Sequence, residues 1–376
     1  MSTIKVNRIE NTSTTDGGVS IDVNGHVTID GQQLPTAGPL SNRNIVINGA
    51  MQVAQRGNNF AGVTTGPSYA VDRWRWQGSS IGTWEMSQSA EAPTSSGFAK
   101  SFKAECTSGA SVSAGSFALI RTVLEGQDLQ RFAKGTASAK SFALSFWVRS
   151  TTTGTYSIYL YDNDNQREIS ATYTIDAINT WEYKSIIIDP DTVGAWANDN
   201  GDSLYVNFYL AAGSNFTSGT FNSTWQADNS SGRASSSQAQ LNTTGQQFYI
   251  TGVQLEVGSK ATPFEHESYG QTLAKCQRYC TIIDLGTNLN PVHWMFNRAG
   301  GTGSPYTVVD LPTTMRSGPN FNELGSPQVN STNANFMTAT SAGLTVDTAV
   351  AAHQNYAQRC SGTTGTFLKW QFTAEL

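Results

Sequence analysis

Apolar and polar residues alternate through most of the chain, and this period of two is typical of strands that bury one face. Between residues 41 and 265 the alternating segments are short and are separated by clusters of Gly, Ser, Asn and Asp. This pattern predicts an all-β sandwich or barrel, interrupted by one long polar loop over residues 213–245. The expected strands are Arg43–Ile47, Asp72–Gln77, Thr83–Ser87, Ala99–Cys106, Ser116–Val123, Phe142–Arg149, Gly154–Tyr161, Ser170–Thr174, Trp181–Ile188, Ser203–Leu210 and Gln247–Val257.

A separate short hairpin is expected within residues 1–40, a polar segment that ends in a linker. Its apolar residues alternate with polar ones on both sides of an Asn-Gly pair, which is a strong hairpin signal. They are Val19, Ile21, Val23, Val27 and Ile29. A three-residue loop would pair Val23 with Val27 and Ile21 with Ile29, which keeps one apolar face. The hairpin cannot bury that face alone, so it needs a neighbouring domain, a partner or copies of itself.

The pattern changes after residue 265. Tyr269, Leu273, Cys276 and Cys280 recur three or four positions apart, which predicts a connecting helix over residues 266–283. Cys276 and Cys280 would share one face of it, and without a histidine at metal-ligand spacing we expect buried thiols instead of a zinc site. Residues 284–376 return to turn-rich β composition and predict a smaller distal β domain.

Composition excludes several classes of function. Only 14% of the residues are charged and the net charge is −5, whereas a nucleic-acid partner requires a basic face. No apolar run is long enough to span a membrane, and residues 1–17 lack the apolar core of a signal peptide. We therefore expect neither nucleic-acid binding nor membrane insertion. The four cysteines are too few for a disulfide framework and are expected to be reduced.

Catalytic chemistry has little support in the sequence. It contains no nucleophile elbow, phosphate loop or Cys-x-x-Cys, and its four histidines lack ligand spacing. A pair of carboxylates could hydrolyse a glycosidic bond or donate oxygens to Ca²⁺, but the candidates lie in turns, where Asp usually bonds the local backbone. They are Asp162, Asp164, Glu168, Asp189 and Asp191. No cofactor is expected, calcium stays open, and a polysaccharide depolymerase is the minority alternative.

Three central strands carry a sharper signal, because each has an aliphatic face for the core and a second face that mixes aromatic and polar groups. The side chains of that second face are Trp147, Arg149, Tyr159, Tyr161, Tyr205, Asn207 and Tyr209. If the three strands are neighbours, these side chains form one wet surface. Sugars present C–H groups to rings and hydroxyls to polar groups, so the surface suits a glycan. It also suits a subunit interface, where Tyr, Trp and Arg are enriched, or a face covered by loops.

The strand at Asp72–Gln77 combines two tryptophans with arginines. Trp74 and Trp76 share one face, whereas Arg73 and Arg75 share the other and could pair with carboxylates. We interpret the tryptophans as core residues and the arginines as a solvated face.

Several motifs resemble segments of tail fibre and receptor-binding proteins of tailed bacteriophages. The leader over residues 1–10 and the hairpin resemble the leaders of such fibres. Residues 44–57, which contain Asn-Gly and Gln-Arg-Gly, and Tyr69-Ala-Val-Asp-Arg-Trp74 are similar to a fibre pattern, with Met51-Gln-Val replacing its aromatic-containing run. The most specific match is Ile250-Thr-Gly-Val-Gln-Leu-Glu-Val-Gly-Ser-Lys-Ala-Thr-Pro-Phe-Glu265, continuing into Cys276-Gln-Arg-Tyr279. The resemblance implies a jelly roll like that of carbohydrate-binding modules, a trimeric fibre and a place on the virion.

The sequence thus predicts a homotrimeric tail fibre protein of the virion, synthesised in the host cytoplasm, that adheres to a lipopolysaccharide-like host surface glycan without catalysis. Residues 1–40 would attach it to a tail, baseplate or adaptor protein, and residues 41–265 would form the jelly roll. In the distal domain, Trp294, Asn297 and Tyr306 are candidate contacts at the tip. The alternatives are a structural virion protein, either a capsid decoration or a fibre adaptor, and the depolymerase.

Overall fold

The computed structural model describes residues 41–284, 306–323 and 369–376, together with short strands at 8–10, 18–21, 27–29, 32–33, 328–330, 336–338, 343–346 and 355–361. The chain divides into two compact units, residues 1–267 and 268–376, and each is described here by itself. Among the described residues, no helix has the length and apolar character that crossing a membrane requires.

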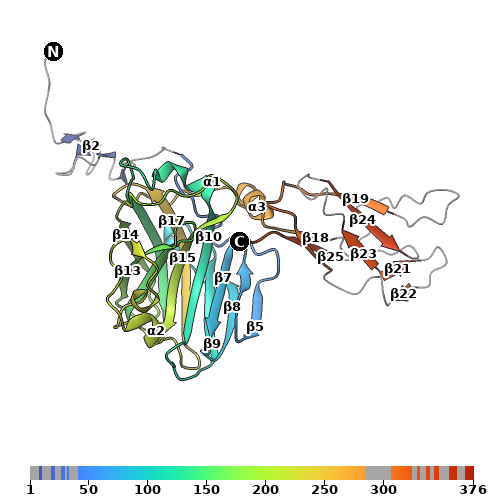
Figure 1. Ribbon diagram of the computed structural model, residues 1–376, viewed down its shortest axis with the longest axis horizontal. Coiled ribbons are helices and arrows are strands. Elements are labelled where there is room, and N and C mark those ends of the chain that lie inside the picture. Colours follow the sequence, from blue (N-terminus) through green and yellow to red (C-terminus); the bar gives the residue numbers. More distant parts are fainter. Residues whose placement is uncertain are drawn as a thin grey trace, which may run out of the picture. The chain divides into compact units, whose positions relative to one another are not determined.

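Two antiparallel sheets form the sandwich of the first unit (Figure 1). The larger sheet has seven strands in the order β16 (Gln226–Ala227), β13 (Arg167–Ile175), β12 (Gly154–Asp162), β15 (Asp202–Ala212), β10 (Phe117–Glu125), β7 (Trp74–Ser79) and β6 (Ser68–Val71). The smaller sheet has six, in the order β14 (Glu182–Ile188), β11 (Phe142–Ser150), β17 (Gln247–Val257), β9 (Ser101–Ser108), β8 (Thr83–Ser89) and β5 (Asn59–Val63). Strands distant in sequence are neighbours in both sheets, and the fold is a jelly roll, as expected.

The core lies between the sheets and is rich in aromatic rings. Trp76 of the larger sheet packs against Trp84 of the smaller one with 5.4 Å between ring centroids, and Phe146 meets Phe208 edge to face at 5.2 Å. The aliphatic-rich faces predicted for β11, β12 and β15 all point into this core. Because a side chain of this size contributes about 2 kcal/mol or more when buried, the inner faces fix the register of every strand.

One predicted strand, Arg43–Ile47, is wrong, whereas every other predicted segment of the sandwich overlaps a strand of the structure. Side-chain oxygens satisfy most of the backbone N–H groups of this segment instead of a strand ladder, and the Ile45 N–H donates to the Leu255 carbonyl. The Glu265 carboxylate accepts the N–H groups of Asn42 and Asn44 at 2.7 and 3.0 Å, and the Asn44 amide oxygen accepts those of Val46 and Leu255 at 3.0 and 3.1 Å. The segment is therefore a strap that ties the start of the jelly roll to its end.

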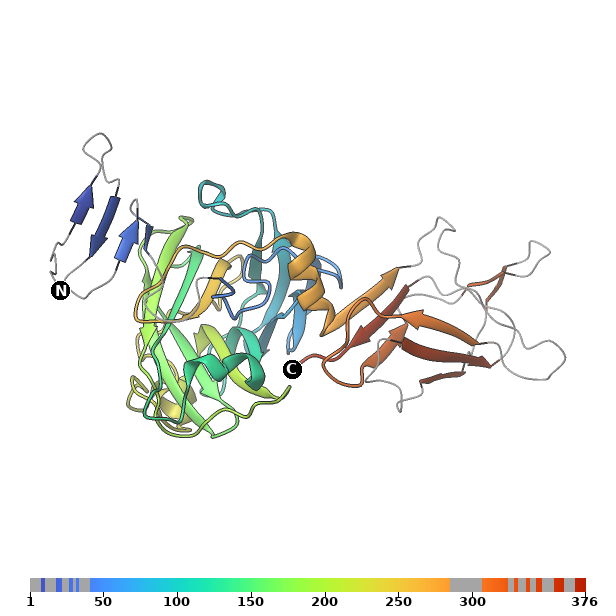
Figure 2. The same ribbon diagram turned by 90° about the horizontal axis from the view of Figure 1, so that it is seen from above.

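The predicted hairpin is present, within a small sheet of β1 (Arg8–Glu10), β2 (Gly18–Ile21), β3 (Val27–Ile29) and β4 (Gln32–Gln33) (Figure 2). Its predicted register is wrong, because Ile21 pairs with Val27 and Val19 with Ile29. Both registers keep the apolar residues on one face, so periodicity alone could not choose between them. Ile9, Ile21 and Ile29 are 62%, 44% and 43% exposed in this sheet.

The second unit begins with a helix that is shorter than predicted. α3 (Tyr269–Gln277) starts at a capping box between Ser268 and Gln271, and it does not continue to residue 283. Cys280 instead begins β18 (Cys280–Asp284), which pairs with β25 (Lys369–Thr373). Cys276 and Cys280 are both buried free thiols, but only Cys276 is helical.

The remaining described strands of the second unit form three small sheets with those two. β20 (Asn320–Glu323) extends the sheet of β18 and β25. A second sheet has the order β19 (Tyr306–Asp310), β24 (Asn355–Ser361) and β23 (Gly343–Val346), and β21 (Gln328–Asn330) pairs with β22 (Phe336–Thr338). The described part of this unit is mostly β, as the sequence predicts.

Candidate functional site

The outer face of the larger sheet brings together tyrosine and arginine side chains from several adjacent strands. β12 and β15 are neighbours, with Tyr161 opposite Tyr205 and Tyr159 opposite Asn207. On the other side of β15, Asn207 lies opposite Arg121 of β10, which in turn lies opposite Arg75 of β7. Gln77 of β7 and Tyr69 of β6 belong to the same sheet. We use the name tyrosine–arginine surface for six half-buried residues of this sheet: Tyr69, Arg75, Gln77, Arg121, Tyr161 and Tyr205.

Arg121 is at the centre of the tyrosine–arginine surface. Its guanidinium lies over the Tyr205 ring, 4.9 Å from the centroid, and donates to the amide oxygens of Asn207 and, at 3.2 Å, Gln77. Burial and the nearby charge of Arg75 lower the pKa of Arg121 to about 10, so the group is still cationic at neutral pH. Burial and a hydrogen bond to Asp202 raise the pKa of Tyr205 to about 12, so its hydroxyl keeps its proton.

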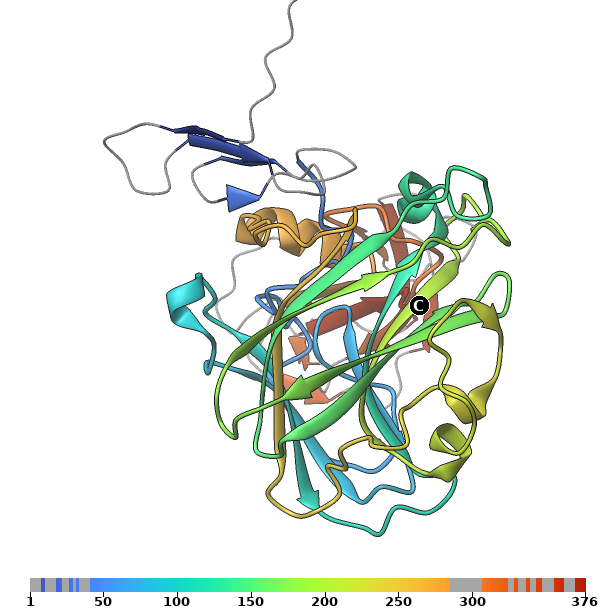
Figure 3. The same cartoon turned by 90° about the vertical axis from the view of Figure 1, so that its left-hand side faces the viewer.

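A long loop, residues 213–245, covers part of this face. It contains α2 (Ser214–Thr217), β16 and the 3-10 helix η3 (Ser230–Gly232), and Figure 3 shows it in yellow-green beside the strands of the larger sheet. Arg233 of this loop lies over the rings of Tyr159 and Tyr161, 4.7 and 5.7 Å from their centroids. Tyr159, Asn207 and Tyr209 are only 3%, 0% and 2% exposed. None of the three belongs to a wet surface: the loop covers Tyr159 and Tyr209, whereas Asn207 is buried within the sheet between Arg121 and the Tyr159 carbonyl.

Trp147 and Arg149 do not belong to this face, so their predicted place beside Tyr159 is wrong. Their strand, β11, lies in the smaller sheet. There Trp147 packs against Tyr183 at 5.5 Å, and Arg149 lies over the Tyr249 ring and pairs with Glu91. Alternation assigns a residue to a face of its strand but does not tell which sheet the strand joins.

The distal candidates are outside what the structure describes in side-chain detail. Trp294 and Asn297 lie outside the described residues. Tyr306 is the first residue of β19, and only its backbone is described. These three predictions stay predictions.

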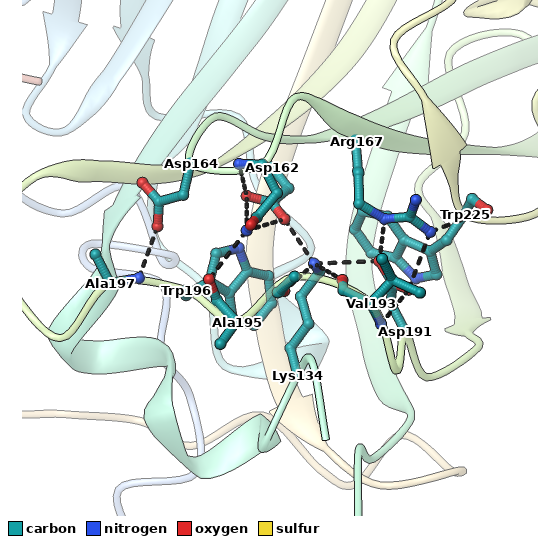
Figure 4. Close-up of polar contacts among 12 residues, drawn as sticks. Lys134, Asp162, Asp164, Arg167, Asp191, Val193, Ala195, Trp196, Ala197 and Trp225 are labelled. Carbon is teal, nitrogen blue, oxygen red and sulfur yellow. Dashed lines mark hydrogen bonds and ion pairs between the residues drawn. The ribbon is translucent and has the colours of Figure 1, made fainter. Parts of the chain in front are cut away.

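Two of the five carboxylates weighed for catalysis, Asp162 and Asp191, meet at the buried Lys134 (Figure 4). The Lys134 ammonium lies 2.6 Å from Asp162 Oδ2 and 3.1 Å from Asp191 Oδ2, and it donates to the carbonyl oxygens of Val193 and Gly194. Lys134, Asp162 and Asp191 are 4%, 0% and 4% exposed. Arg167 forms a second ion pair with Asp191 at 2.8 Å. Two carboxylates and two backbone carbonyls thus surround the Lys134 ammonium.

Two of the other three carboxylates also have partners within the chain. Glu168 is buried and pairs with Arg233 at 2.9 Å, whereas the exposed Asp164 accepts the Ala197 N–H at 2.8 Å. Asp189 is exposed, and its backbone carbonyl accepts from the Trp225 indole. No group of three or more His, Cys, Asp or Glu side chains suited to a metal ion occurs in the described part of the chain. Of the loop carboxylates considered for calcium, Asp162 and Asp191 contact the Lys134 ammonium instead.

Sequence reasoning did not single out Arg121, Gln77, Tyr69 or Lys134. Arg121 follows Ile120 in a strand of ordinary alternation, and the sequence places Arg75 only on a solvated face. A polar residue in the middle of an apolar strand is a detectable signal, but its neighbours come from strands far apart in the chain. Lys134 gave no signal because its partners Asp162 and Asp191 lie in two later segments.

The fold and the tyrosine–arginine surface define a jelly-roll protein with a half-buried aromatic and cationic face. No family model and no curated protein matches the chain. Among solved structures it is similar to tailspike protein 4 of bacteriophage CBA120, with 16% identity and a TM-score of 0.31 over 57% of this chain and 21% of that one. The match thus spans about a fifth of the tailspike chain.

Carbohydrate-binding modules are also among the similar structures. TmCBM61, solved with beta-1,4-galactotriose, matches with 10% identity and a TM-score of 0.28 over 57% of this chain and 99% of its own. The CBM22-1 xylan-binding domain of Paenibacillus barcinonensis Xyn10C matches with 9% identity and a TM-score of 0.28 over 60% and 99%. Similarity at this level assigns neither a ligand nor an activity to the chain.

Replacing Lys134 by methionine should destabilise the protein strongly. The change leaves Asp162 and Asp191 buried without the ammonium between them, and breaking a buried ion pair costs about 3–5 kcal/mol of unfolding free energy. Urea denaturation of the full chain measures this. The matched control is Lys140→Met, at an exposed lysine nearby, with an expected change within about 0.5 kcal/mol. Equal stability of the two variants would contradict the structural role of Lys134.

Asp191 should give the stability of the protein an acid dependence. Burial alone would raise the pKa of Asp191, but hydrogen bonds from Arg167, the Val193 N–H and Lys134 outweigh it and hold that pKa below its usual value. The stabilisation is therefore complete above the ordinary value of about 4 and is lost as the pH falls through the lowered pKa.

Urea denaturation over a series from pH 6 down to pH 3 tests this dependence. Asp191→Asn should be less stable than the unaltered protein at pH 6 and should lose less stability on acidification. Asp189→Asn, at an exposed position, should retain the original profile. Parallel profiles for Asp191→Asn and the unaltered protein would show that Asp191 contributes no such dependence.

Proposed function

We propose that the tyrosine–arginine surface binds a glycan, and that the protein is a phage tail fibre adhesin that attaches the virion to a lipopolysaccharide-like glycan of its host. The observation that carries the proposal is the grouping of half-buried Tyr161, Tyr205, Arg121 and Gln77 on adjacent strands at the middle of one sheet. Ligand sites commonly combine aromatic area with a few placed polar groups, and this row has both.

The side chains of the tyrosine–arginine surface suit a sugar. The edges and faces of Tyr161 and Tyr205 can pack against C–H groups, since aromatic rings combine apolar area with a weakly negative face. The Gln77 amide and the Arg121 guanidinium can bond hydroxyls. Arg121 and Asn207 are held by hydrogen bonds to each other, and Asn207 also donates to the Tyr159 carbonyl at 2.9 Å. The polar groups are therefore positioned before a ligand arrives.

The fibre part of the proposal rests on the resemblance of the motifs and on the N-terminal sheet. Ile9, Ile21 and Ile29 are exposed there, and an exposed apolar face on so small a sheet favours a partner. We propose that residues 1–40 attach the chain to a tail, baseplate or adaptor protein and that the protein is a homotrimer. Three linked weak sites raise avidity without any new contact.

We also propose that adhesion involves no catalysis. A glycosidase needs one carboxylic acid and one free carboxylate facing the same bond. Asp162 and Asp191 are instead buried around Lys134, and Glu168 is buried against Arg233. These ion pairs support a binding protein over a depolymerase.

Removing either ring should weaken glycan binding. We expect Tyr161→Ala and Tyr205→Ala to reduce the affinity for the glycans that the full chain binds on an array by about tenfold, the loss of one good aromatic contact. Tyr183→Ala is the control, because Tyr183 is 45% exposed on the smaller sheet. Loss of binding in Tyr183→Ala alone would move the site to the smaller sheet, and binding to no glycan would leave only a structural role.

The place of the protein on the virion can be observed directly. Antibodies raised against the full chain should label the tail of purified phage particles that contain it, and should block their adsorption to host cells. Labelling confined to the capsid would instead identify a decoration protein and reject the adhesin proposal.

A further inference from the structure

We infer that the glycan recognised by the tyrosine–arginine surface is acidic, and that Arg121 holds a carboxylate or phosphate group of one sugar unit. This inference rests on the proposed glycan-binding function and names the class of its ligand. Its basis is a difference between Arg121 and the other arginines that stack on tyrosine rings in the jelly roll.

Three of those arginines have a carboxylate partner within the chain. Arg149, over Tyr249, pairs with Glu91, and Arg233, over Tyr159, pairs with Glu168 at 2.9 Å. Arg56 lies over Tyr69, 4.7 Å from the centroid, and is 3.6 Å from Asp72. In each case the protein itself balances the charge.

Arg121 is different, because its side-chain partners are neutral. Nε donates to Asn207 and Nη1 to Gln77, and the guanidinium lies over Tyr205. No carboxylate of the described residues forms an ion pair with it. A guanidinium has five N–H donors in a planar fork, and these two bonds leave donors for a ligand. Because Asn207 is itself fixed by the Tyr159 carbonyl, the fork is held in one orientation.

A second cation lies beside the first. Arg75 of β7 is directly opposite Arg121 in the register of the sheet, and its Nη1 is 3.4 Å from the Tyr69 hydroxyl. Two like charges on adjacent strands repel each other, and this repulsion increases as the groups are withdrawn from water. An anion bound between them would remove the repulsion and would gain charge-assisted hydrogen bonds. A neutral sugar would gain neither.

The geometry suits a planar or tetrahedral oxyanion on a sugar. Arginine binds carboxylates and phosphates through two parallel N–H bonds, and Tyr205 and Tyr161 adjoin this position with ring area for the sugar itself. The ligand class is therefore an acidic saccharide whose charged unit lies at Arg121 and whose neighbouring units extend over the tyrosines.

An array of acidic and neutral bacterial surface glycans tests this inference with the full chain. Each glycan that binds is then compared with its carboxyl-reduced form and its phosphatase-treated form, which separate carboxylate from phosphate as the recognised group. We expect acidic glycans to bind and one of the two treatments to weaken binding roughly tenfold to a hundredfold, as loss of a charged hydrogen-bond pair does. Added salt should weaken binding in the same direction.

Variants of the chain separate recognition from folding. Arg121→Gln should reduce binding of the acidic glycan to the level of its neutralised form while leaving residual binding of that form unchanged. Arg121→Lys keeps the charge without the fork and should lie between the two. Arg149→Gln, on the smaller sheet, is the matched control and should bind as the unaltered protein does. Thermal unfolding of each variant identifies any loss that comes from misfolding.

The outcomes distinguish the two levels of the proposal. Equal binding of native and neutralised glycans, or an equal loss of both in an Arg121→Gln variant whose melting temperature is unchanged, would reject the acidic ligand while leaving glycan binding intact. Binding to no glycan of either kind would reject the proposed function and this inference with it.

Discussion

The structure depends on one constraint, which is that each strand of the jelly roll buries every second side chain between the two sheets. On β7, Trp74 and Trp76 enter the core, so Arg75 between them must face outward. On β10, the buried Ile120 sets Arg121 on the same outer face. A slip of one residue in β10 would place the Arg121 guanidinium among the aromatic rings of the core. The core therefore selects the residues of the candidate site, and the surface contacts only refine their positions.

The motifs that resemble phage fibres mostly serve this framework. Gln254 and Glu256 are buried, and Glu256 holds the Thr262 hydroxyl at 2.7 Å, while Glu265 accepts from residues 42–44. These bonds join the two ends of the jelly roll. Within the tyrosine–arginine surface, Tyr69 is the member that a motif contains, and Arg121 lies outside all of them. The resemblance therefore covers segments of the framework and does not extend to Arg121.

Sequence reasoning predicted the local features well because strand alternation is itself local. The bounds predicted for Gln247–Val257 are those of β17. It failed where long-range placement decides the outcome: β11 and β12 follow each other in the chain but join different sheets, so Trp147 was assigned to the wrong surface. The predicted hairpin register was wrong for another reason, because two registers place the same apolar residues on one face. The burial of Tyr159 and Tyr209 could not be predicted from the sequence either, since the covering loop has no periodic apolar pattern that would show where it packs.

That loop makes the two sides of the outer face chemically different. Arg233 comes with the loop and pairs with Glu168 and Asp228, so the charge above Tyr159 is balanced inside the protein. The loop brings no described carboxylate to Arg121, which contacts only neutral partners. Without the loop, the tyrosines on the outer face would have similar surroundings. With the loop, the positive charge beside Tyr159 is balanced by Glu168, whereas the positive charge of Arg121 beside Tyr205 has only neutral partners. Such a gradient would orient the proposed acidic ligand, because the reversed orientation would separate its charged unit from Arg121.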